Sequence, residues 1–249
     1  MDILLTNDDG VSASALWALC EVLDGMGEVT VVAPREEQSG VGHAITYRTP
    51  VRVEKLNGGR RGWTVTGTPA DCVKFALLEI LGSPPDLVVS GINSGLNLGC
   101  NVFYSGTVAA ALEGALYGIR SVAFSCDPGG MSDPKATARQ AGRALEVILE
   151  RGPAAALAYN VNLPVLRNGP PEIVFARHRS RAFRERYVRE ELDGAPGFRL
   201  DLPYGEEAAP GDPCDVVAVQ EGKISITPLR ASLTDHETLE EINACSDPD

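Results

Sequence analysis

The chain has 249 residues, of which 44% are hydrophobic, and a formal net charge of −12. This length and apolar content are sufficient for one substantial hydrophobic core. The acidic balance excludes broad binding to nucleic-acid polymers, which requires a basic surface. No run of about 18 apolar residues occurs, so we expect no membrane helix and no membrane partner. The short apolar start does not have the form of a signal peptide, which predicts a cytoplasmic protein.

The cysteines and histidines do not form a zinc-binding pattern. The chain has six cysteines and three histidines, and no Cys-x-x-Cys pair occurs. Scattered cysteines of this kind are typical of reduced, mostly buried small residues. They are Cys20, Cys72, Cys100, Cys126, Cys214 and Cys245.

The N-terminal stretch combines a buried strand with an acidic turn. Ile3, Leu4 and Leu5 form a short apolar run that predicts a buried strand, and Asp8 and Asp9 follow it directly. Adjacent carboxylates repel each other and lose solvation at the top of a sheet unless a cation compensates them. This pattern favours a site for a hard divalent cation. An ordinary polar turn is the alternative, and the acidic pair alone does not decide between them.

The next elements predict a parallel crossover followed by a long loop. Apolar residues at helical spacing predict a helix over residues 16–23, and a β-branched run predicts a strand over residues 28–33. Strand, helix and strand in this order form a right-handed crossover. The loop over residues 34–46 then leaves the carboxyl end of the second strand, so it can reach the acidic pair. Loops of this length in a compact domain tend to be functional or mobile.

A hairpin and a capped helix follow the loop. Residues 51–55 and 63–66 predict two strands, with a turn at residues 57–59. Thr68 as N-cap and Pro69 at the first position predict the start of a helix. Residues 86–90 then predict a third core strand.

A segment rich in glycine and asparagine follows this strand. Asn93, Asn97 and Asn101 recur at every fourth position, between glycines that permit tight turns. Asparagine offers an amide oxygen to a metal and N–H groups to a phosphate. Ser105, Gly106 and Thr107 then begin a helix, and a helix N-terminus is a ready anion site. An ordinary capped helix behind a polar loop is the alternative.

Strands and helices continue to alternate up to about residue 163. The alternation predicts a three-layer αβα fold, Rossmann-like, with a mostly parallel sheet. The expected elements are helices over residues 108–117 and 134–150 and strands over residues 121–125 and 157–163.

The texture of the chain changes after residues 170–171, which are both proline. Residues 172–176 predict a strand, and seven arginines occur between residues 177 and 199. Residues 187–189 and 198–200 flank a turn signal at residues 193–197, which predicts a C-terminal β-hairpin arm outside the core. Such an arm suits an oligomer contact, although a solvated surface hairpin has the same pattern.

The end of the chain predicts two further elements. Residues 215–219 and 223–227 have the pattern of a last hairpin over Glu221 and Gly222. Residues 234–237 (TDHE) have the pattern of a capping box that begins a short C-terminal helix.

Three of these elements converge on one edge of the predicted sheet. The acidic pair, the loop with Ser39 and the loop with Asn93 and Asn97 all leave the carboxyl ends of expected parallel strands, where ligands bind in such sheets. Two carboxylates, a hydroxyl and an amide form an all-oxygen site suited to Mg²⁺ or Mn²⁺. The start of the helix at residues 105–107 supplies donors for a phosphate beside the cation.

The chain resembles the SurE survival-protein family in five motifs that occur in the family's order over nearly the whole sequence. The motifs are residues 3–10 (ILLTNDDG), 37–40 (EQSG), 67–73 (GTPADCV), 90–99 (SGINSGLNLG) and 104–111 (YSGTVAAA). The resemblance implies a Rossmann-like catalytic core over residues 1–176, an oligomerising arm over 177–210, and a C-terminal hairpin and helix over 211–249 that is swapped between subunits.

The same resemblance implies a divalent-metal-dependent hydrolase that converts nucleoside 5′- and 3′-monophosphates to nucleoside and phosphate, an activity like that of an acid phosphatase. It implies one divalent cation per subunit, Mg²⁺ or Mn²⁺ with Co²⁺ as a third candidate, and a homodimer or homotetramer. The implied metal ligands are Asp8, Asp9, Ser39 and Asn93. The implied substrate-binding residues are Asn97, Ser105, Gly106 and Thr107, and the implied catalytic residues are Asp8, Asp9 and Asn97.

Two other classes of protein stay open at this point. A receiver-type regulatory module also has an acid pair after its first strand, but no acid follows the strand at residues 86–90, where a phospho-accepting aspartate would lie. A nucleotide-binding protein without catalysis is the second alternative. The preferred base, the choice between 5′ and 3′ esters, and hydrolysis of polyphosphate are not determined by the sequence.

Overall fold

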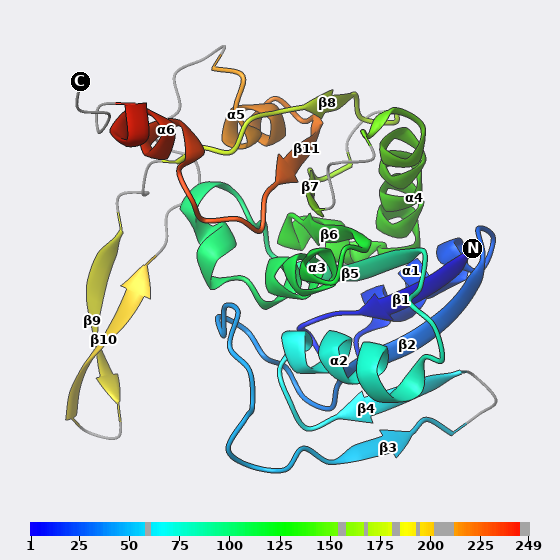
Figure 1. Ribbon diagram of the computed structural model, residues 1–249. Helices are drawn as coiled ribbons and strands as arrows, with labels where there is room; N and C mark the ends of the chain where they lie inside the picture. The colour runs from blue at the N-terminus through cyan, green and yellow to red at the C-terminus, as the bar shows by residue number, and fades with distance from the viewer. Residues whose placement is uncertain are drawn as a thin grey trace.

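A nine-stranded sheet forms the centre of the protein, with helices on both of its faces (Figure 1). The computed structural model describes residues 1–57, 61–153, 158–166, 169–180, 185–192, 195–201 and 212–244. The strand order is β3-β4-β2-β1-β5-β6-β7-β11-β8, and only the pairs β3/β4 and β7/β11 are antiparallel. The predicted α/β class with a mostly parallel sheet is confirmed.

The bounds of the elements agree with most of the sequence predictions. The strands of the main sheet are β1 (Asp2–Thr6), β2 (Glu28–Pro34), β3 (Val53–Lys55), β4 (Gly62–Val65), β5 (Leu87–Ser94), β6 (Arg120–Cys126), β7 (Ala158–Leu163), β8 (Ile173–Phe175) and β11 (Ile224–Leu229). The helices are α1 (Ser14–Leu23), α2 (Pro69–Phe75), α3 (Gly106–Leu116), α4 (Pro134–Arg151), α5 (Asp215–Gln220) and α6 (His236–Ala244), with shorter turns η1 (Ala76–Ile80), η2 (Gly99–Tyr104) and η3 (Pro128–Ser132).

Alternate residues of β1 show how the three layers are packed. Ile3 and Leu5 are buried in the cluster that contains α1 and α4. Leu4 lies in a second cluster, with residues of α2 and α3 on the other face of the sheet. Successive side chains of a strand point to opposite faces, so a strand covered by helices on both sides must be apolar throughout. This explains the continuous apolar run that begins the sequence.

The strand β5 extends four residues beyond the predicted end at Ser90 and carries Asn93 to the edge of the sheet. The pairing with β6 shifts register between Ser90 and Asn93. Gly91 lies in this irregularity at a φ of 138°, and a Cβ atom there would lie 2.4 Å from the carbonyl oxygen of Phe124. Only glycine permits this close approach.

The hairpin predicted over residues 215–227 is wrong. Residues 215–220 form the helix α5, and β11 joins the main sheet between β7 and β8. Val216 and Val217 are buried against Leu96 and Leu98, so the apolar run packs as a short helix rather than as a strand. Tertiary packing decides the conformation of short apolar runs of this kind.

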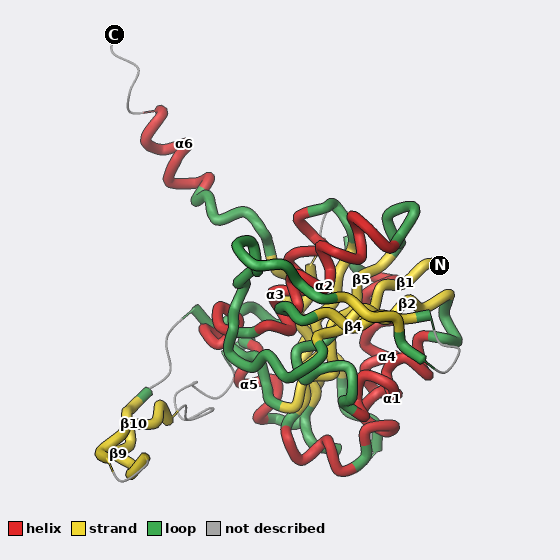
Figure 2. The backbone as a smooth tube through the Cα atoms, turned by 90° about the horizontal axis from the view of Figure 1, so that it is seen from below, coloured by secondary structure: helices red, strands yellow, loops and turns green. Residues whose placement is uncertain are grey.

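The predicted arm is a two-stranded antiparallel hairpin of β9 (Arg186–Leu192) and β10 (Ala195–Asp201), and it stands away from the sheet in both views (Figures 1 and 2). Residues 195–197 of the predicted turn lie in β10, and residues 193–194 lie outside the described part of the chain. Residues 58–59 of the turn predicted for the earlier hairpin also lie outside it. The C-terminal helix α6 also projects from the body (Figure 2). None of the helices in the described ranges has the length and apolarity needed to cross a bilayer.

Candidate active site

Asp8 and the first turn of α3 form the floor of the site. Asp8 is buried at the end of β1. The hydroxyl of Thr107 donates to Oδ1 of Asp8 at 2.5 Å, and the Thr107 backbone N–H donates to Oδ2 at 3.2 Å. Gly106 makes this contact possible, because a Cβ atom there would lie 3.1 Å from both Cβ of Asp8 and Cγ of Pro69. The helix N-terminus therefore lies directly against the carboxylate, where its dipole favours negative charge.

The acidic pair is electrostatically unfavourable. Burial raises the pKa of Asp8 to about 6, opposed by the bond from Thr107 and reinforced by the charge of Asp9. Burial also raises the pKa of Asp9, opposed by the N–H of Ser94, which donates to Oδ2 of Asp9 at 3.2 Å, and reinforced by Glu37. Two carboxylates in such surroundings favour the binding of a cation, which would compensate both charges.

Ser39, in the loop after β2, and Asn93, near the end of β5, line the same cavity as Asp8. The N–H of Gln38 donates to the carbonyl oxygen of Asp8 at 2.7 Å and so fixes the loop beside β1. The Ser39 hydroxyl donates to Oε1 of Glu37 at 2.5 Å. Nδ2 of Asn93 donates to the carbonyl oxygen of Gly95 at 2.7 Å, which orients the amide.

A cavity of about 290 Å³ joins these groups, and five of the eight sequence-predicted site residues line it. The five are Asp8, Ser39, Asn93, Asn97 and Ser105; the remaining lining residues are Gly40, Ser94, Gly95, Leu96, Asn101 and Tyr104. The other three predicted residues lie beside the cavity. Asp9 bonds to the Ser94 backbone, and Gly106 and Thr107 pack on Asp8.

Asn97 is fixed by a buried polar network that the sequence reasoning missed. Its backbone N–H donates to Oδ1 of Asn162 at 2.8 Å, and its carbonyl oxygen accepts from Nδ2 of Asn160 at 2.7 Å. Its own Nδ2 donates to the Ser125 hydroxyl at 2.7 Å. The available signal was the strand AYNVNL at residues 158–163, in which asparagines interrupt an apolar strand near its carboxyl end. Buried amides of this kind require partners, which predicts a polar network at that edge.

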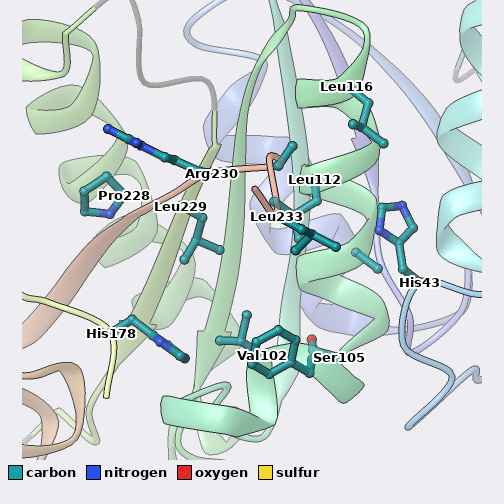
Figure 3. Close-up of a pocket in the computed structure, with 13 residues that line it drawn as sticks. His43, Val102, Ser105, Leu112, Leu116, His178, Pro228, Leu229, Arg230 and Leu233 are labelled. Atoms are coloured by element: carbon teal, nitrogen blue, oxygen red, sulfur yellow. The ribbon is translucent and has the colours of Figure 1, made fainter. Parts of the chain in front are cut away.

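A larger apolar pocket of about 550 Å³ lies next to this cavity, and Ser105 lines both. Its wall is mostly aliphatic, including Leu112 of α3 and Leu229 of β11. Figure 3 shows His43 and His178 at opposite sides of the pocket, with Ser105 near its lower end. The cavity around Asp8 therefore opens towards an apolar surface at Ser105.

The donor set fits a hard divalent cation. Across the described parts of the chain, no group of three or more His, Cys, Asp or Glu side chains forms a metal site. The set around the cavity is instead mixed: two carboxylates, the Ser39 hydroxyl and the Asn93 amide, all with oxygen donors. Oxygen ligands of this kind suit Mg²⁺ or Mn²⁺ and disfavour Zn²⁺ and Cu²⁺, which prefer sulfur and nitrogen.

Comparisons with known proteins agree over nearly the full length of the chain. The family described as survival protein SurE matches residues 3–185. The chain is 42% identical over 250 residues to 5′-nucleotidase SurE 1 of Thermus thermophilus, covering 98% of this chain and 97% of the relative. It is 40% identical to 5′-nucleotidase SurE of Heliobacterium modesticaldum, covering 98% of this chain and 91% of the relative. The crystal structure of the SurE protein from Aquifex aeolicus superposes with a TM-score of 0.84 at 36% identity, covering 99% of this chain and 100% of that one.

Proposed function

This chain belongs to the SurE family, and we propose that it is a divalent-metal-dependent phosphomonoesterase that hydrolyses nucleoside 5′- and 3′-monophosphates. One observation carries the proposal: an acidic pair, a hydroxyl and an amide surround a cavity that ends at the start of a helix. The relatives named as 5′-nucleotidases support the choice of a nucleotide as substrate.

The proposed cation ligands are Asp8, Asp9, Ser39 and Asn93. When bound, a divalent cation polarises a phosphoryl oxygen and lowers the pKa of water. The chain fixes the ligand geometry itself, because Thr107 holds both carboxylate oxygens of Asp8 and the Ser94 N–H holds Asp9. Preorganised ligands of this kind cost little reorganisation when the ion binds.

The phosphate binds, in this proposal, at Asn97 and at the helix start formed by Ser105, Gly106 and Thr107. Ser105 caps α3 by accepting from the N–H of Val108 at 3.1 Å, which places its side chain at the cavity. The network beneath Asn97 keeps its backbone fixed as charge redistributes over the phosphoryl oxygens. Asp8 or Asp9 orients the attacking water or accepts its proton.

The hairpin β9–β10 and the helix α6 are the proposed elements of a homodimer or homotetramer. Tyr187, Phe198 and Leu200 lie on the same face of the hairpin by the strand register, with 70%, 67% and 39% of their surfaces exposed. An isolated two-stranded hairpin is at best marginally stable in water. Helix α6 has no buried residue in the described part of the chain. Exposed apolar residues on projecting elements are typical of contacts between subunits.

The test is hydrolysis of a panel of nucleoside 5′- and 3′-monophosphates before and after removal of metal with a chelator. We expect loss of phosphate release on chelation and recovery with Mn²⁺, Mg²⁺ or Co²⁺. Undiminished turnover by the stripped protein would refute the metal dependence. Binding of nucleotides without turnover would indicate a nucleotide-binding protein, and stable phosphorylation of the chain would indicate a receiver-type module.

A further inference from the structure

A second buried carboxylate lies on α3, away from the acidic pair. Glu113 is only 3% exposed, and its two oxygens have different partners, a lysine and a histidine. Lys74 of α2 donates from Nζ to Oε1 at 2.5 Å, and Nε2 of His43 lies 2.9 Å from Oε2. Burial raises the pKa of Glu113, but the bonds to His43 and Lys74 outweigh it, and the net pKa lies below its ordinary value. Glu113 therefore stays charged and bound to both partners.

His43 belongs to the loop that carries Ser39. It lies four positions after this proposed metal ligand. Among the described contacts, it is the only residue of the Ser39 loop (residues 35–46) whose side chain bonds to α3. Figure 3 shows its ring beside α3. The bond to Glu113 therefore ties the far side of the loop to the helix whose first turn holds Asp8.

Backbone contacts fix the same loop on either side of Ser39. At the near end, Gln38 donates to the carbonyl oxygen of Asp8. At the far end, the N–H of Gly42 donates to the carbonyl oxygen of Tyr104 at 2.9 Å. Gly42 has a φ of 56°, and a Cβ atom there would lie 3.1 Å from the carbonyl oxygen of Phe103, so the loop approaches η2 closely. Ser39 therefore lies in a short segment whose two ends are fixed by backbone hydrogen bonds.

Beyond His43, the loop is bound to the N-terminus of α2. Oγ1 of Thr68 donates to the carbonyl oxygen of Ala44 at 2.7 Å. The N–H of Thr46 donates to both carboxylate oxygens of Asp71, at 3.0 and 3.1 Å. These contacts bind the end of the loop to α2. The position of the loop relative to α3 is therefore set by the bonds of Gly42 and His43.

We infer that Glu113 and His43 are positioning residues that hold Ser39 at the distance from Asp8 that the site requires. The inference rests on the proposed function, in which Ser39 and Asp8 bind the same cation. Glu113 does not line the cavity around Asp8, so it acts through the loop and not on the substrate. The charge of Glu113 strengthens the bond to His43, because hydrogen bonds with an ionised partner are about twice as strong as neutral ones.

The test compares three variants of the full-length protein. His43→Ala removes the loop's bond to Glu113, whereas His43→Gln keeps a donor near the position of Nε2. Lys74→Met is the matched control, because it removes the other partner of Glu113, a residue of α2 that is not part of the Ser39 loop. The first measurement is hydrogen exchange of peptides covering residues 38–46 in the metal-free protein. The second is binding of Mn²⁺ alone, from the signal of the unbound ion in electron paramagnetic resonance.

We expect His43→Ala to speed exchange in residues 38–46 and to weaken Mn²⁺ binding, each by about tenfold, the effect of losing one hydrogen bond to a charged group. His43→Gln is expected to recover most of both, and Lys74→Met to leave both near the wild-type values. Wild-type exchange and Mn²⁺ binding in His43→Ala would overturn the inference. So would equal effects of Lys74→Met and His43→Ala, which would indicate only packing between α2 and α3.

The proposed function and this inference can be refuted by different results. A wild-type protein that binds no Mn²⁺ and releases no phosphate would refute the metal-dependent hydrolase. The exchange measurement on the metal-free variants would still report whether His43 fixes the loop.

Discussion

The buried amide of Asn162 offers a quantitative test of how β7 supports the cavity. Asn162 is fully buried, and its side chain forms two hydrogen bonds with the backbone of Asn97. Oδ1 accepts from the Asn97 N–H at 2.8 Å, and Nδ2 donates to the Asn97 carbonyl oxygen at 3.1 Å. The substitution Asn162→Ala removes both bonds and leaves the Asn97 N–H buried without this acceptor.

The two lost bonds differ in their expected cost. An orphaned buried N–H costs about 1–3 kcal/mol of unfolding free energy. The carbonyl oxygen of Asn97 keeps its bond from Asn160 at 2.7 Å, so losing the bond from Asn162 to this oxygen costs less free energy. With the space left by the missing amide, we expect a total of about 2–4 kcal/mol. For a chain of this size each kcal/mol lowers the melting temperature by about 2–4 °C, which gives a decrease of about 4–16 °C.

Ser225→Ala is the matched control for this experiment. Ser225 is opposite Asn162 in the register of β11 and β7, and it is equally buried. Its hydroxyl has no hydrogen-bond partner within the described residues, so its removal is expected to change the free energy of unfolding by less than about 0.5 kcal/mol, or to raise it. Urea denaturation followed by tryptophan fluorescence measures both variants.

Activity provides the second measurement on Asn162→Ala. If Asn97 contacts the phosphate, the variant that still folds should have a raised KM for p-nitrophenyl phosphate, whereas Ser225→Ala should not. An unfolding free energy within about 0.5 kcal/mol of the wild type, with an unchanged KM, would refute the role given to this network.

Two further predictions concern the proposed metal site and the arm. Asp9→Asn and Asn93→Ala should each lower turnover of a nucleoside monophosphate by at least about 100-fold without loss of stability, because the acidic pair carries repulsion that folding must tolerate. A near wild-type rate in Asp9→Asn would contradict the ligand assignment. An unfolded Asp9→Asn variant would instead favour the alternative that the acidic pair is an ordinary structural turn. Combined Tyr187→Ser and Phe198→Ser should lower the mass measured by sedimentation while leaving hydrolysis of p-nitrophenyl phosphate intact. Leu78→Ser, 60% exposed on η1, is the control, and an unchanged mass in the arm variant would argue against assembly through the hairpin.

Most of the fold could be predicted because the chain is locally consistent. Continuous apolar runs predict strands buried on both faces, and β1 has this form from Ile3 to Leu5. Polar residues that follow the carboxyl ends of parallel strands meet at one edge of the sheet, so the sequence predicts that Asp8 and Asn93 lie close together. The position of the candidate site follows from topology and needs no side-chain detail.

The features that the sequence did not reveal depend on tertiary contacts. The run from Val216 to Val219 has no period that separates a strand from a short helix, and burial against Leu96 decides it. The partners of Asn97 are 28 to 65 residues away in the chain. Ser125 and Asn162 come together beside Asn97 only because β6 pairs with β7. Long-range contacts of this kind are set by the register of the sheet, which local patterns do not specify.

Glu113 on α3 and Asp8 beside the first turn of α3 are both buried carboxylates, but their charges are compensated differently. Glu113, in the middle of the helix, is paired with Lys74 and His43, so the chain compensates its charge by itself. Asp8, at the helix start, has a hydroxyl, backbone N–H groups and the neighbouring Asp9 instead, and within the described residues neither aspartate forms an ion pair with Lys, Arg or His. A buried carboxylate that the fold does not neutralise is costly to maintain. The proposed cation would supply positive charge at Asp8, where the described residues provide none by an ion pair.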